Sequence, residues 1–154
     1  MRILLAWEIG IGYGHVTKLV PVARALHAHD ATGACDLTFA VKAPAAVSLF
    51  ADDLPCRVVQ APFQPVAPSA KRSTPLVYSD DLRGCGYADV DTLTGLIRAW
   101  RGLYDLLEPD LLVVDAAPTA LVAARDHALP SAVLGSGYGA PPRTAPLPAI
   151  PYWE

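Results

Sequence analysis

A histidine follows a glycine-rich turn near the start of the chain, and its position is the first that could carry chemistry. The stretch WEIGIGYGHV contains Gly10, Gly12 and Gly14 and then His15. Histidine has an ordinary pKa of about 6.5, so a neutral ring can take a proton from a hydroxyl group near neutral pH. A carboxylate on the other ring nitrogen would fix the tautomer and stabilise the imidazolium ion. The candidate for that carboxylate is Asp115, which closes the apolar run LLVVD.

The same glycines invite a second interpretation, a phosphate cradle for a dinucleotide. That fingerprint is G-x-G-x-x-G after a strand, with an acidic residue at the end of the second strand. Here the third glycine comes one place early, and the second apolar run ends in Val41-Lys42-Ala43, with Asp36 at its beginning. We therefore expect weak or no binding of nicotinamide dinucleotides. A third interpretation stays open from spacing alone: His15 and Asp115 could simply cap the helices that follow them.

Apolar runs alternate with helical periodicity along most of the chain. This pattern predicts a doubly wound α/β domain, a mainly parallel sheet with helices on both faces, similar to a Rossmann fold. No regular element is predicted between residues 62 and 90. Strands are expected over 2–7, 36–41, 56–61, 110–115 and 131–135, and helices from 17 at the earliest, over 44–50, from about 91 to 107, and over 118–129.

The expected strand order 3-2-1-4-5 places the first and fourth strands side by side, with their carboxyl ends at one edge. His15 and Asp115 follow those two strands, so their loops should open into the same crevice. Ser136 and Tyr138 follow the fifth strand and point to the same edge. Glu8 comes directly after the first strand, where it either lines the site or is a solvated or hydrogen-bonded loop carboxylate. Trp100, in the helical stripe before residue 107, is expected in the core.

Length and composition limit the alternatives. The 154 residues suit one domain. Hydrophobic residues make up 53% and charged residues 18%, yet no apolar run is long enough for a membrane span, and we expect a cytoplasmic protein. A net charge of -3 without a large basic cluster argues against nucleic-acid binding. Three separated cysteines without a C-x-x-C pair suggest neither a disulfide framework nor a metal site, and no cofactor is expected.

The motifs GHV, PVARAL and EPDLLVVDAAPTALVAARDHALPSAVL resemble the N-terminal half of GT-B glycosyltransferases that use nucleotide-sugar donors. The resemblance covers nearly all of the chain. It implies that His15 deprotonates an acceptor hydroxyl and that Asp115 orients it. Lys18 is a departure, since many relatives have proline three residues after the histidine. Candidate substrate-binding residues at the loops around this site are Gly12, Tyr13, Gly14, Ser136 and Tyr138.

The resemblance also implies a division of the chain. Residues 1–140 would form the acceptor-binding domain, and the proline-rich residues 141–154 a linker toward a C-terminal nucleotide-sugar-binding domain. Expected partners are then a small-molecule or lipid-linked acceptor hydroxyl and that donor-binding domain or subunit. The chain alone should lack transferase activity. The alternative is a stand-alone, non-catalytic binding subunit of a split glycosyltransferase.

Overall fold

A five-stranded parallel sheet forms the centre of the protein, as predicted. The computed structural model describes residues 1–30, 33–65, 77–135 and 145. The strand order is β3-β2-β1-β4-β5, with every neighbouring pair parallel. The strands are β1 (Arg2–Trp7), β2 (Asp36–Val41), β3 (Cys56–Gln60), β4 (Leu111–Val114) and β5 (Ser131–Val133).

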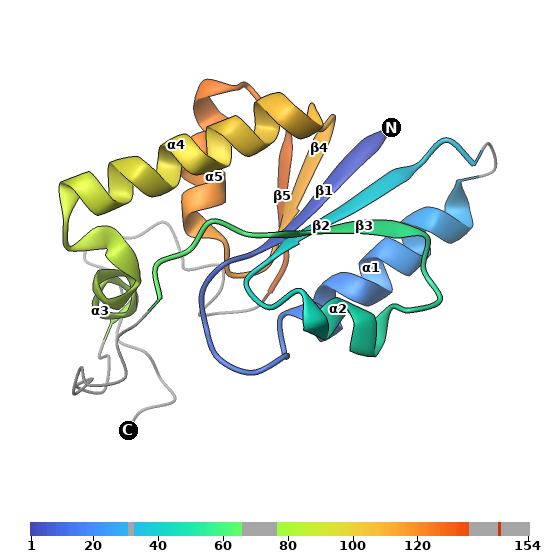
Figure 1. Ribbon diagram of the computed structural model, residues 1–154, viewed down its shortest axis with the longest axis horizontal. Coiled ribbons are helices and arrows are strands. Elements are labelled where there is room, and N and C mark those ends of the chain that lie inside the picture. Colours follow the sequence, from blue (N-terminus) through green and yellow to red (C-terminus); the bar gives the residue numbers. More distant parts are fainter. Residues whose placement is uncertain (31–32, 66–76, 136–144, 146–154) are drawn as a thin grey trace.

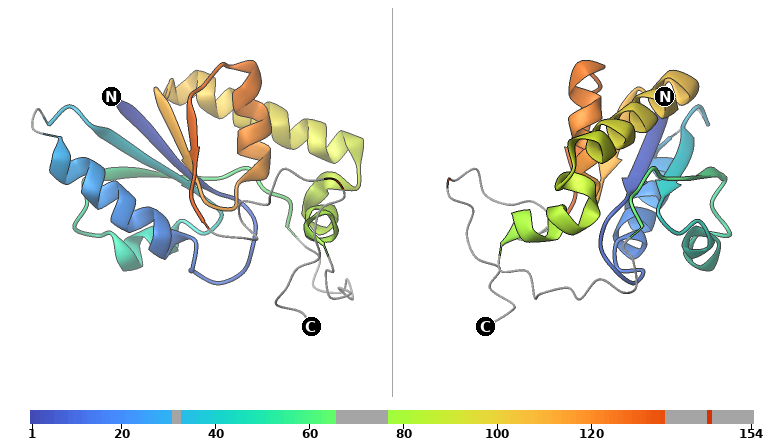
Figure 2. Two further views of the ribbon diagram at one scale, coloured as in Figure 1. Left: turned by 180° about the vertical axis from the view of Figure 1, so that it is seen from behind. Right: turned by 60° about the vertical axis from the view of Figure 1, so that its left-hand side comes forward.

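Helices cover both faces of this sheet. Figure 1 shows α1 (Val16–His29) and α2 (Ala45–Phe50) on one side and α4 (Val90–Leu107) and α5 (Pro118–Asp126) on the other. The views of Figure 2 show the same two layers from behind and from the side. No helix in the described ranges is long and apolar enough to span a membrane.

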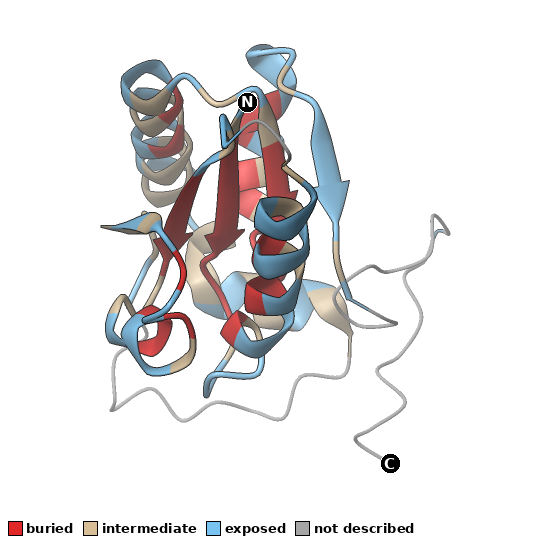
Figure 3. Ribbon diagram, turned by 90° about the vertical axis from the view of Figure 1, so that its right-hand side faces the viewer, coloured by how far each residue is buried: buried red, intermediate tan, exposed pale blue. Residues whose placement is uncertain are grey.

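Strand β1 alternates between two hydrophobic cores. Ile3, Leu5 and Trp7 pack toward α1 and α2, whereas Leu4 and Ala6 pack toward α4 and α5. This is why RILLAW is apolar along its whole length: a strand covered on both faces needs apolar residues in both directions. Side chains of β3 and β5, at the edges of the sheet, are more exposed, and Figure 3 shows the buried strands at the centre.

Two helical regions differ from the sequence-based prediction. Helix α1 begins at Val16, and Pro21 lies inside it rather than in its first turn. The helix tolerates the lost backbone hydrogen bond because one face of it is anchored in the core by Val16, Leu19, Val20 and Ala23. The segment without a predicted element contains α3 (Tyr78–Leu82) and the irregular helical turn η1 (Arg83–Tyr87). These turns are short and lack a sustained apolar period.

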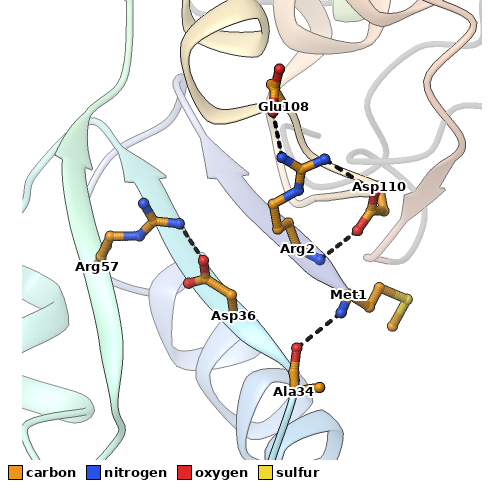
Figure 4. A network of polar contacts seen from close by, with 7 residues as sticks. All are labelled: Met1, Arg2, Ala34, Asp36, Arg57, Glu108 and Asp110. Atoms are coloured by element: carbon orange, nitrogen blue, oxygen red, sulfur yellow. Dashed lines mark hydrogen bonds and ion pairs between the residues drawn. The ribbon is translucent and has the colours of Figure 1, made fainter.

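Ion pairs gather at the amino ends of the strands. Arg2, at the start of β1, contacts Glu108 at 2.6 Å and Asp110 at 3.6 Å, and Asp36, at the start of β2, pairs with Arg57 of β3 (Figure 4). The N-terminal ammonium donates to the carbonyl oxygen of Ala34. These contacts tie neighbouring strands together at the edge opposite to His15.

Candidate functional site

The pairing of β1 with β4 brings two loops together at the carboxyl edge of the sheet. The ladder runs from Ile3 opposite Leu111 to Ala6 opposite Val114, so both strands end at the same level. Beyond the ladder, the backbone N–H groups of Glu8 and Ile9 both donate to the carbonyl oxygen of Ala116, at 3.2 and 3.0 Å. The loop that leads to His15 is therefore fastened to the loop that carries Asp115.

His15 lies at the junction of this first loop and α1. It occupies the N-cap position of α1, but its backbone has helical dihedral angles and its side chain makes no capping hydrogen bond, so capping does not explain the side chain. The imidazole stacks on the Trp7 ring with 5.6 Å between centroids, and its side chain is 22% exposed. Nδ1 lies 3.2 Å from Oδ2 of Asp115. The structure thus brings the two predicted residues into direct hydrogen-bonding distance.

Asp115 is buried, although an aspartate side chain is ordinarily a negatively charged carboxylate. Its side chain is 1% exposed. Oδ2 faces His15 Nδ1 and also the ammonium of Lys18, which lies 3.6 Å away. A buried carboxylate needs such partners because the interior solvates its charge poorly. Asp115 is not the cap of α5, whose N-cap residue is Ala117, without a side-chain capping bond.

The contact of Nδ1 with Asp115 decides which nitrogen of the His15 ring could accept a proton. When Nδ1 of a neutral histidine donates to a carboxylate, the lone pair is on Nε2. This nitrogen of His15 lies beside Gly10, where the absence of a side chain leaves room for the imidazole ring. Lys42 donates to the Gly10 carbonyl oxygen at 2.6 Å and helps to hold the turn in place. The site can therefore present a neutral imidazole, oriented by Asp115, as a base.

Glu8 has a role that the sequence did not show. Its side chain points to the other face of the sheet, where Oε1 accepts from the backbone N–H of Thr119 at 2.5 Å and Oε2 accepts from Trp100 Nε1 at 2.7 Å. Glu8 is 2% exposed, and burial raises its pKa to about 7. Glu8 is therefore the hydrogen-bonded carboxylate of the alternatives considered: it accepts from a free N–H in the first turn of α5 and does not line the His15 site.

One signal in the sequence could have indicated this contact. The segment before α5 reads DAAPTA, with Ala117 rather than a polar residue at the N-cap. A helix without its own cap needs an acceptor from elsewhere. Trp100 is fully buried in the core, as predicted, but its indole N–H also completes this network.

The candidate substrate-binding residues differ in what the structure shows of them. Gly12 has a φ of +69°, which favours glycine, and nothing lies within 4 Å of the place where its side chain would start. The same space is open at Gly14, which has no positive φ. Tyr13 is 46% exposed, and its ring lies edge-on to Phe50. Ser136 and Tyr138 lie outside the described residues.

The structure offers less support for a dinucleotide site or a metal site. Lys42 occupies the end of β2, where a dinucleotide site would need a carboxylate for the ribose, and Asp36 is at the far edge with Arg57 (Figure 4). Within the described ranges, no group of three histidine, cysteine, aspartate or glutamate side chains could hold a metal ion.

Comparison with known proteins identifies the class of fold. No known family pattern matches the chain, and no curated protein matches it in sequence. Among solved structures, MurG from Acinetobacter baumannii has a TM-score of 0.57 at 15% identity, over 86% of this chain and 34% of that protein. The glycosyltransferase of kitacinnamycin has a TM-score of 0.56 at 20% identity, over 86% and 29%. The fold is a Rossmann-like domain that resembles one half of GT-B glycosyltransferases.

The fold alone does not identify the activity. The chain spans about a third of the length of these glycosyltransferases. The C-terminal domain of a hydrogenase from Pyrococcus furiosus also matches, with a TM-score of 0.51 at 12% identity, over 86% of this chain and 89% of that domain. Since one fold serves proteins of different function, the function of this chain has to be argued from its site.

Proposed function

We propose that this chain is the acceptor-binding half of a glycosyltransferase that moves a sugar from a nucleotide-sugar donor to an acceptor hydroxyl. The observation that carries the proposal is the 3.2 Å contact between His15 Nδ1 and Asp115 Oδ2, at the carboxyl ends of two adjacent parallel strands. Ligands of open α/β sheets bind at this edge, where the strand order reverses. The acceptor is a small or lipid-linked molecule with a free hydroxyl group.

In the proposed reaction, His15 is the general base. Nε2 takes the proton of the acceptor hydroxyl while its oxygen forms a bond to the anomeric carbon of the sugar. The bond between that carbon and the nucleotide phosphate breaks, and the phosphate keeps the electron pair. Asp115 stabilises the imidazolium ion that forms and holds the ring so that Nε2 faces the acceptor. A positioned base of this kind contributes about 10²–10⁴-fold to the rate.

The donor is assigned to a second domain or subunit. GT-B glycosyltransferases, which this fold resembles, hold the nucleotide-sugar mainly with their other Rossmann-like half. In the proposed protein, the reaction therefore takes place between the two halves.

The test is a transfer assay with radiolabelled nucleotide-sugars and a panel of hydroxyl-bearing acceptors. The protein is this chain joined to, or mixed with, its donor-binding half, compared with its His15→Ala variant. We expect product with the wild type, a loss of turnover in the variant, and none with the chain alone. Product formation that is unaffected by His15→Ala would instead favour a non-catalytic binding subunit, and robust turnover by the chain alone would overturn the two-half assignment.

A further inference from the structure

We propose that Lys18 controls the protonation of His15 through the carboxylate that the two side chains share. In this arrangement, the Lys18 ammonium offsets part of the negative charge of Asp115, so that this carboxylate favours the protonated ring less strongly. Lys18 acts through Asp115 and is a positioning residue rather than a catalytic one. The role in catalysis rests on the proposed function, whereas the electrostatic coupling itself does not.

The geometry places a nitrogen of each side chain, His15 and Lys18, close to one oxygen atom of Asp115. His15 Nδ1 lies 3.2 Å and Lys18 Nζ 3.6 Å from Oδ2 of Asp115. Lys18 follows His15 by three residues, which places the two side chains on the same side of α1. Asp115 is 1% exposed, while Lys18 is 53% exposed. The partly exposed Lys18 ammonium therefore contacts the Asp115 carboxylate, which is itself shielded from water.

The other ionisable groups near the ring point elsewhere. Lys42, at the end of β2, donates to the Gly10 carbonyl oxygen. The Glu8 carboxylate lies on the opposite face of the sheet with Thr119, and Tyr13 packs its ring against Phe50. One face of the imidazole stacks on the uncharged Trp7 ring, and its Nε2 edge lies against Gly10. Within the described part of the chain, Asp115 is thus the charged group in contact with His15, and Lys18 is the charged group paired with that carboxylate.

The two charges act in opposite directions on the ring. A carboxylate beside an imidazole favours the imidazolium form, and a protonated ring cannot accept the proton of an acceptor. A nearby ammonium disfavours a second positive charge. Without Lys18, Asp115 would act unopposed, and the ring would bind its proton at higher pH. Because Lys18 is half exposed, solvent screens its effect, and we expect a change in this direction that is small.

Proton NMR of the histidine ring signals tests the coupling in this chain without any assay of activity. The His15 signal is assigned by its loss in His15→Gln and followed from pH 4.5 to 9. We expect the titration midpoint to rise in Lys18→Met and to stay near the wild-type value in the charge-conserving Lys18→Arg. Arg24→Met is the matched control, since it removes a cation of the same helix that pairs with Asp53. A midpoint in Lys18→Met equal to that of the wild type and of Arg24→Met would overturn the proposal.

Kinetics separate this inference from the proposed function. In the glycosyltransferase that contains this chain, the acid limb of the kcat/KM profile should move to higher pH in Lys18→Met by the same amount as the NMR midpoint. The activity at high pH should change less than the activity at pH 6. An NMR shift without a matching kinetic shift would establish the coupling and contradict the assignment of His15 as the base.

Discussion

Gly10 lies directly against the Nε2 edge of the His15 ring. A side chain on residue 10 would overlap Nε2, and its first carbon would also lie 3.1 Å from Cδ2. Gly10 has a φ of +95°, a conformation that favours glycine over every other residue. The first glycine of the turn is therefore explained by the histidine that follows it, without any phosphate group.

The first prediction concerns this packing. Gly10→Ala should lower the free energy of unfolding by about 1–3 kcal/mol, because the alanine is strained at positive φ and also displaces the ring. Gly12→Ala is the control. Gly12 also has a positive φ, of +69°, but nothing lies within 4 Å of an added side chain, so this substitution introduces only the backbone strain. Urea denaturation of both variants measures the difference. Equal destabilisation would show that the contact with His15 costs nothing.

The second prediction concerns Asp115, the carboxylate that orients the proposed base. Asp115→Asn keeps a hydrogen-bonding group of similar size but loses the charge that stabilises the imidazolium ion. In the complete protein, if it is the proposed glycosyltransferase, we expect lower turnover with the fold intact, and a smaller loss than the roughly 10²–10⁴-fold expected of His15→Ala. Steady-state kinetics and circular dichroism measure both. The control Asp53→Asn alters an exposed carboxylate on the Arg24 guanidinium and should leave turnover unchanged.

The third prediction concerns pH and the buried carboxyl of Glu8. Burial raises its pKa from 4.5 to about 7, so the folded protein keeps this proton at pH values where the unfolded chain releases it. The resulting stabilisation is complete below pH 4.5 and is lost as the pH rises through about 7. A shift of this size corresponds to about 3 kcal/mol.

Comparison with Glu8→Gln isolates this contribution from the other titrating groups. The glutamine does not ionise, although its amide cannot accept hydrogen bonds from Thr119 and Trp100 at once. We expect the free energy of unfolding of the wild type to fall relative to that of the variant between pH 4.5 and 8, measured by urea denaturation at each pH. Two parallel curves would contradict the raised pKa.

The fourth prediction concerns the dinucleotide alternative. Titration calorimetry with oxidised NAD and NADP should show weak or no binding, because the third glycine comes early and Lys42 stands where the ribose carboxylate is needed. The Lys42 ammonium is already engaged by the Gly10 carbonyl oxygen. Tight binding of one cofactor per chain would restore this alternative.

The amino-acid sequence by itself determined the architecture. The bounds of β1 and β2 follow from runs such as RILLAW and DLTFAV, since a strand covered on both faces is apolar throughout. The predicted strand order then placed His15 and Asp115 at one edge, because the carboxyl ends of adjacent parallel strands coincide. The pattern of apolar residues along the chain is therefore sufficient to predict the strands and the edge at which their loops meet.

Beyond the predicted pair of His15 and Asp115, only the tertiary structure decided which polar groups meet. Glu8 accepts hydrogen bonds from Thr119 of α5, 111 residues away in the chain, and from Trp100, 92 residues away. Lys18 and His15 both contact the same oxygen of Asp115. The turns of α3 and η1 likewise had no periodic signal to predict them. The physical reason is that apolar burial depends on a side chain's own type and spacing. The burial of a charged group instead depends on polar partners from distant parts of the chain, and these come close together only when the chain has folded.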